Sequence, residues 1–147
     1  MNHAATAKYV NILDPVSDSG TFASDNSVDT LGYSYLTIVV STGQSSGISA
    51  LKLQESDDSG MSGATDISGS VVGTALDIDG GTSTLPSSSN DEIHVFNLDL
   101  GGRKRYIDVA ATFSGATLTS IVGILTEPDE ATTVLADRGV NTMIDIA

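Results

Sequence analysis

Residues 92–126 constrain the fold of this chain more than any other part of its sequence. Two runs with β-type patterning, 92–100 and 106–113, flank a glycine-initiated turn at 101–105, and an apolar run follows at 118–125. In the run 106–113, apolar and polar residues alternate as in a strand with one buried face. Two such runs on either side of a short turn predict a hairpin, and the segment as a whole predicts an antiparallel β-protein.

The rest of the chain extends this pattern. Acidic residues are mostly Asp, and Ser and Thr are abundant. Asp and Ser favour turns while Thr favours strands, so long helices are disfavoured. Further strands are expected at 8–13, closed by Asp14-Pro15, and at 33–41, 64–72 and 76–79. The run 48–55 predicts a strand with a bulge near its start or a shorter strand that begins near Ala50, and 17–29 is expected to be a surface loop. Seven or eight short strands predict a β-sandwich, with a jelly roll preferred to an immunoglobulin-like fold.

The 147 residues fit one β-sandwich domain over 1–126. Residues 127–147 differ, because Pro128 follows the last expected strand and apolar residues are then scattered among polar ones. This segment is expected to be an extended arm, packed on a neighbouring subunit or on its own sandwich. A short helix over 129–136 is the alternative.

Net charge limits the classes of partner. A charge of −13 and a pI near 4.1 argue against nucleic acid and against an anionic membrane. The amino-terminal residues lack the pattern of a signal peptide, and no apolar run approaches the roughly 18 residues of a membrane span. The chain is therefore expected to be soluble and unprocessed. It has no cysteine, which excludes disulfides and thiolate chemistry.

Three of the six basic residues, Arg103, Lys104 and Arg105, lie in the turn 101–105. A cluster of cations at a hairpin tip has few acidic partners on its own strands, which favours an intersubunit or capsid contact. A solvated hairpin tip is the alternative. Exposed ion pairs contribute only about 0–1 kcal/mol each, so such charges would set register more than affinity.

No catalytic site is expected. His3 and His94 are the only histidines, and neither a Gly-x-Ser-x-Gly elbow, a phosphate loop nor a dinucleotide fingerprint occurs. No cofactor is predicted. Asp57 with Asp58, and Asp77 with Asp79, are calcium candidates, but the spacing of a complete calcium loop is missing and solvated turns are the alternative.

Several segments together resemble a known family. They are Leu51-Lys52-Leu53-Gln54-Glu55-Ser56-Asp57-Asp58-Ser59-Gly60, Thr65-Asp66-Ile67-Ser68-Gly69, Gly102-Arg103-Lys104-Arg105-Tyr106-Ile107, Ile124-Leu125 and Arg138-Gly139. In this order, over residues 48–139, the chain resembles a family of small virion proteins of tailed bacteriophages. These proteins are usually encoded near the major capsid protein and are taken to be head decoration, or cement, proteins.

The resemblance implies a non-enzymatic β-sandwich that binds the exterior of a phage capsid and stabilises the assembled head. The implied partners are the major capsid protein and further copies of the chain, as a trimer or as lattice neighbours. Arg103, Lys104, Arg105 and Arg138 would lie at capsid or intersubunit contacts, and the segment from Glu127 would bridge subunits. The alternative is an adhesion, receptor-binding or carbohydrate-binding module of a tail or head fibre.

Overall fold

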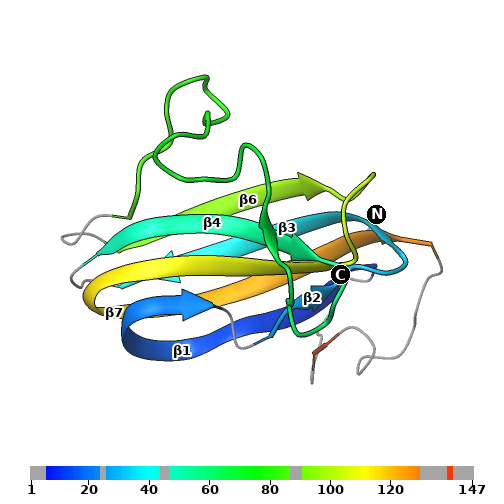
Figure 1. Ribbon diagram of the computed structural model, residues 1–147, viewed down its shortest axis with the longest axis horizontal. Coiled ribbons are helices and arrows are strands. Elements are labelled where there is room, and N and C mark those ends of the chain that lie inside the picture. Colours follow the sequence, from blue (N-terminus) through cyan, green and yellow to red (C-terminus); the bar gives the residue numbers. More distant parts are fainter. Residues whose placement is uncertain (1–5, 24–25, 44–46, 87–90, 130–138, 141–147) are drawn as a thin grey trace, which may run out of the picture.

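The computed structural model describes residues 6–23, 26–43, 47–86, 91–129 and 139–140, and this part of the chain is all-β (Figure 1). The strands are β1 (Lys8–Ala23), β2 (Val28–Asp29), β3 (Tyr33–Thr42), β4 (Ile48–Ser56), β5 (Thr65–Asp66), β6 (Glu92–Asp99) and β7 (Tyr106–Pro128). The described residues include no helix long and apolar enough to cross a membrane. The prediction of an all-β fold is confirmed.

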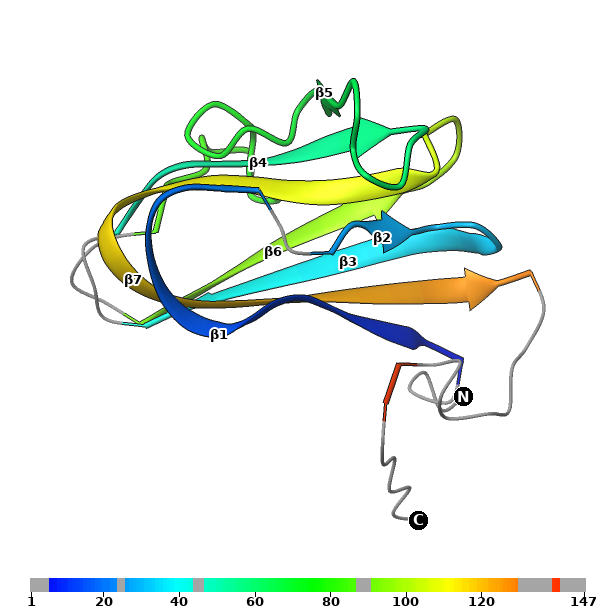
Figure 2. The same ribbon diagram turned by 60° about the horizontal axis from the view of Figure 1, so that its bottom comes forward.

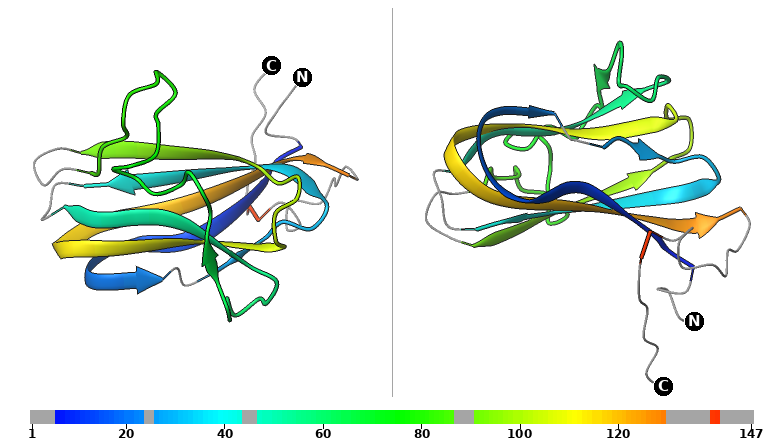
Figure 3. Two further views of the ribbon diagram at one scale, coloured as in Figure 1. Left: turned by 45° about the horizontal axis from the view of Figure 1, so that its top comes forward. Right: turned by 90° about the horizontal axis from the view of Figure 1, so that it is seen from below.

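The 23-residue strand β7 organises one antiparallel sheet of order β5-β4-β7-β3-β6, to which β1 and β2 also add along β7. The first half of β7 pairs with β4, as in Leu53↔Val109, and the second half pairs with β3, as in Val39↔Val122. β1 accompanies β7 through both halves. Figure 2 and the right-hand view of Figure 3 show both strands curling from one layer to the other, so the sheet folds over on itself like a sandwich.

The core lies between the two layers. Alternate residues of β3 and of the second half of β7 face those of β4 and the first half of β7, and burying this apolar surface is the main favourable term in folding. The largest fully buried side chains are Ile12, Leu36, Ile38, Leu51, Leu53, Ile67, Ile107, Ile121, Leu125, Val28, Val40 and Val109.

Two strand predictions are confirmed closely. The run 33–41 forms β3, with Leu36, Ile38 and Val40 fully buried. The run 48–55 forms β4, and a register shift against β7 between Ile48 and Ala50 is the predicted bulge. The run 64–72 forms only the two-residue β5, and 76–79 contributes a single bridge between Leu76 and Thr82.

The amino-terminal prediction is wrong, because β1 does not end at Asp14-Pro15 and 17–29 is not one loop. β1 continues to Ala23, and Asp18 and Thr21 pair with Thr117 and Thr112 of β7. The strand tolerates Pro15 because the register is irregular between Leu13 and Val16. Polar side chains are compatible with an outer strand, since main-chain hydrogen bonds and not burial hold it.

The predicted hairpin between 92–100 and 106–113 is also wrong. β6 pairs with β3, whereas the first half of β7 pairs with β4, so the turn 101–105 crosses between the two layers. The runs 106–113 and 118–125 are halves of the single strand β7, because β1 follows it around the bend. β6 is not largely buried, since Ile93 and Val95 are 69% and 53% exposed.

The carboxy-terminal segment is described only in part. β7 ends at Pro128, two residues beyond the expected domain boundary, and most of the possible helix 129–136 lies outside the described residues. Gly139 is in the left-handed region with a φ of 71°, and a Cβ on it would overlap the carbonyl oxygen of Tyr9. Gly139 therefore lies directly against the main chain of β1. The jelly-roll topology, the division into two parts and the role of the arm stay predictions.

Candidate interaction surfaces

Arg105 of the basic turn is held within the chain. Its Nε and Nη2 donate hydrogen bonds of 2.8 and 2.7 Å to the two carboxylate oxygens of Asp29 on β2, and its guanidinium carbon lies 5.1 Å from the centre of the Tyr106 ring. Hydrogen bonding from Arg105 lowers the pKa of Asp29, and the same pair raises the pKa of Arg105. This bidentate pair joins the turn to β2.

The other two basic residues lie next to Glu55 on β4. Arg103 Nη1 is 3.8 Å from the Glu55 carboxylate, and the main-chain N–H of Lys104 donates to it at 3.3 Å. The flanking strands β6 and β7 offer few acidic residues, and the fold brings Asp29 and Glu55 to the turn from β2 and β4. Arg138 lies outside the described residues. Contact of these four residues with a capsid or another subunit stays a prediction.

We expect the Asp29–Arg105 pair to give a pH-dependent difference between the protein and the variant Asp29→Asn. Because the folded-state pKa of Asp29 lies below its ordinary value of 3.8, the pair stabilises the fold above that pH. The contribution is lost as the pH falls through the folded-state pKa. Thermal unfolding at pH 7 should show a Tm lower by a few degrees at most for Asp29→Asn, and the gap should close toward pH 2.

The matched control is Asp57→Asn, which removes the same charge at an exposed position. It should leave the Tm near that of the parent protein across the same pH range. A gap for Asp29→Asn that stays constant down to pH 2 would contradict a stabilising role of the ionised carboxylate. High salt should shrink the gap at pH 7, because exposed pairs are screened.

Three of the four calcium candidates, Asp58, Asp77 and Asp79, accept hydrogen bonds within their own turns, and Asp57 is exposed beside Asp58. Asp58 Oδ1 accepts a hydrogen bond from the N–H of Gly60 at 2.9 Å, and Asp79 Oδ1 accepts one from Gly81 at 2.9 Å. Asp77 Oδ1 accepts from the N–H of Ile78. Such local bonds are typical of Asp in tight turns. In the described part of the chain, no three His, Asp or Glu side chains gather into a group able to hold a metal ion.

The outer side of the layer formed by β6, β3 and the second half of β7 is apolar and almost uncharged. The three strands bring Val95, Val39 and Val122 side by side in one row. We call the outward positions of these strands the apolar face; they are Ile93, Val95, Asn97, Asp99, Tyr35, Thr37, Val39, Ser41, Leu118, Ser120, Val122, Ile124 and Thr126. Asp99 is the one charged residue among them.

The outer side of the opposite layer is polar by contrast. Lys52 and Gln54 on β4 donate hydrogen bonds, both of 2.8 Å, to the carboxylate of Asp66 on β5 and lower its pKa. Their register partners on β7 are Ala110 and Asp108. The two sides of the sandwich therefore differ in chemistry, and the apolar side is the one suited to contact another protein.

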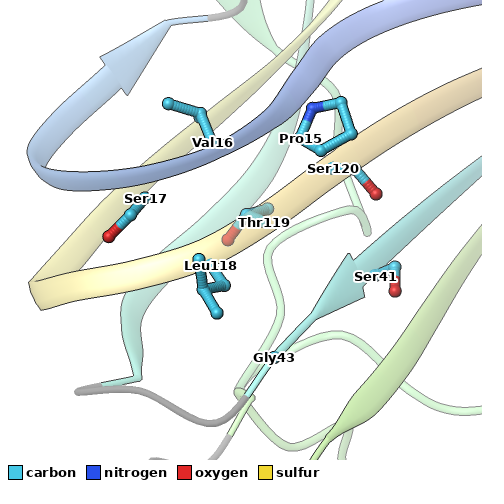
Figure 4. A pocket seen from close by; sticks show the side chains of 8 residues that line it. All are labelled: Pro15, Val16, Ser17, Ser41, Gly43, Leu118, Thr119 and Ser120. Carbon is cyan, nitrogen blue, oxygen red and sulfur yellow. The ribbon is translucent and has the colours of Figure 1, made fainter.

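A small hollow of about 340 Å³ adjoins the apolar face where β1, β3 and β7 meet (Figure 4). Leu118 and Val16, which are 53% and 38% exposed, line it together with hydroxyl groups such as those of Ser17 and Ser41. Leu118 packs close to Gly43, where an added Cβ would lie 3.1 Å from the Leu118 Cβ. The hollow extends the apolar face toward β1.

A larger groove, of about 740 Å³, follows β6 on the side away from β3. Its far wall is the segment 67–84, which main-chain hydrogen bonds from Ile67 to Leu53 and from Val72 to Leu51 tie to β4. Residues 93–98 of β6 form its near wall. We call it the seam groove, because it lies where the curled sheet stops short of closing into a barrel.

No protein-family model matches the chain, and comparison with curated proteins gives no significant match.

Proposed function

We propose that the protein is a non-enzymatic virion structural protein that binds the exterior of a phage capsid and stabilises the assembled head. The resemblance of residues 48–139 to head decoration proteins gives the proposal its biological setting. The observation that carries it is the apolar face, an almost uncharged β-surface on a protein of net charge −13.

The apolar face supports binding to a protein surface. Ile93, Val95 and Leu118 are each more than half exposed, and exposed apolar groups arranged contiguously mark interaction sites more often than isolated ones do. Strong negative charge elsewhere limits non-specific association. The apolar face then supplies the contact, while the charges limit which other surfaces the protein meets.

If many copies bind a symmetric head, modest contacts are sufficient for stable attachment. Each copy bound to two or more capsid subunits converts later contacts into intramolecular ones, which raises overall affinity without new interactions. The paired Arg103 and Arg105 would then help to keep the crossing turn in one conformation. Lys104, whose side chain forms no ion pair with the described residues, would be the residue of the turn that meets an acidic capsid group.

The test is binding of the purified protein to capsids of the parent phage that lack it, measured by co-sedimentation and by electron cryo-microscopy. We expect regular density on the head lattice. Val122→Glu on the apolar face should weaken binding at least tenfold, because a charge would be buried at the contact. Val71→Glu is the matched control, since Val71 is also 37% exposed but lies in the segment 67–84.

Density confined to the tail or a fibre would overturn the proposal and favour the adhesion alternative. Equal losses for Val122→Glu and Val71→Glu would show that added charge in general, and not the apolar face, controls binding. Both variants should unfold within a few degrees of the parent protein, because neither side chain is buried.

A further inference from the structure

β6 is an edge strand of a kind that folded proteins seldom leave uncovered. It pairs with β3 without a register shift over all eight residues, and among the described residues no strand pairs along its other edge. An unpaired strand edge is a template for another strand, especially where its side chains are apolar. Ile93 and Val95 are the two apolar outward side chains of β6, and both are largely exposed.

The other edges of the sheet are protected. β1 carries register irregularities between Asn11 and Leu13 and between Leu13 and Val16, with Asp14 and Pro15 inside the second. Bulges, proline and charge are the usual means of blocking an edge. β5, at the opposite end of the strand order, has only two residues. Strand addition is therefore expected at β6.

The seam groove offers room for the side chains of an added strand. Beside the edge of β6 it is lined by Phe96, Leu98 and His94, and its far wall includes Ile67 and Val72. In a strand added along β6, alternate side chains would point into this space and the others outward, beside the apolar face. A strand with apolar side chains in one phase would therefore suit the groove.

The carboxy-terminal residues 140–147 have this pattern. Their sequence is Val-Asn-Thr-Met-Ile-Asp-Ile-Ala, so Val140, Thr142, Ile144 and Ile146 share one phase. Asn141, Met143, Asp145 and Ala147 share the other phase. The first phase is entirely β-branched, which suits strands.

The same chain cannot place Val140 in its own seam groove. Gly139 lies against Tyr9 of β1, at the opposite end of the layer β1-β7-β3-β6. With strands about 4.8 Å apart, the position beyond β6 is roughly 19 Å away. Val140 follows Gly139 directly, and adjacent Cα atoms are only about 3.8 Å apart, so Val140 of the same chain cannot pair along β6.

We propose that residues 140–147 of a second copy of this chain bind as an added strand along β6, with Val140, Thr142, Ile144 and Ile146 directed into the seam groove. Main-chain hydrogen bonds to β6 supply affinity, and the β-branched row supplies specificity, as in other cases of strand addition. Repeated from copy to copy, the contact is heterologous and generates a closed ring or an open chain of subunits. It does not depend on the proposed capsid binding.

The first test measures the mass of the purified full chain by light scattering after gel filtration, over a range of concentrations. We expect an oligomer. Ile144→Glu should raise the dissociation constant at least tenfold, because it places a charge in the groove. Met143→Glu, the matched control in the outward phase, should retain the oligomer. A monomeric parent protein, or equal effects of the two variants, would overturn the proposal.

The second test locates the contact, and the absence of native cysteine makes it clean. Val95→Cys and Met143→Cys are made in separate chains, one of them tagged, and the mixture is treated with a short bis-maleimide. We expect a mixed cross-linked dimer that is lost when Ile144→Glu is added to the Met143→Cys chain. Thr112→Cys, on the polar side of the sandwich, replaces Val95→Cys as control. Equal cross-linking at 95 and 112 would rule out strand addition at β6.

Discussion

Leu36→Ala is expected to lower the free energy of unfolding by about 2–5 kcal/mol. Leu36 is fully buried at the centre of β3, where its register partners are Leu98 of β6 and Leu125 of β7. Its Cδ1 lies over Gly123, 3.5 Å from the place of a Cβ there. Truncation removes apolar contacts and leaves a cavity that the paired main chains on both sides of β3 cannot close.

The effect is large against a typical total stability of about 5–15 kcal/mol. Urea unfolding followed by circular dichroism should show a lower midpoint with an unchanged m-value, and the Tm should fall by about 4–20 °C. Leu118→Ala makes the same substitution at a side chain that is 53% exposed, and it should cost under about 1 kcal/mol. Similar losses for the two variants would contradict the assignment of the inner and outer sides of the sheet.

The sequence predicts those strands that are held by burial of their own apolar side chains. β3 and β4 follow from their apolar patterning, and the bulge at the start of β4 follows from the change of phase near Ala50. β1 beyond Asp14 could not be predicted in this way, because main-chain pairing with β7 holds a polar stretch. The continuity of β7 also depends on a distant partner, since the bend near Gly115 looks like a strand end unless β1 is known to follow it.

The same limit applies to the candidate surfaces. The basic turn was found from the sequence, but its partners Asp29 and Glu55 are 76 and about 50 residues away in the chain and come from strands that the topology brings in. In β6 both phases are apolar, which predicts burial on both sides. The structure instead leaves Ile93 and Val95 exposed, and this difference from the pattern is what led us to propose strand addition at β6.

Gly123→Val is the second substitution with a large expected effect, a loss of about 1–3 kcal/mol. A Cβ at Gly123 would lie 3.2 Å from Ile12 Cδ1, 3.4 Å from Val28 Cγ2 and 3.5 Å from Leu36 Cδ1. Valine suits a strand better than glycine, but that preference spans only about 1 kcal/mol. The two further methyl groups of valine crowd this space, and we therefore expect Gly123→Val to lower the free energy of unfolding. Gly123→Ala adds the Cβ alone, which flexible side-chain ends can accommodate, and it should cost less.

A double-mutant cycle with Ile12→Val tests whether this crowding is the cause. Ile12→Val removes the Cδ1 atom nearest to the new side chain. Alone it should cost about 0.5–1.5 kcal/mol, because Ile12 is fully buried. In the Gly123→Val background it should cost little or even restore stability, with a coupling energy above about 0.5 kcal/mol by urea unfolding. Additive losses would show that Ile12 Cδ1 does not limit the space at Gly123. Coupling would show that the missing side chain of Gly123 leaves the space in which Ile12 of β1 packs onto β7, at the point where Val28 of β2 and Leu36 of β3 also meet it.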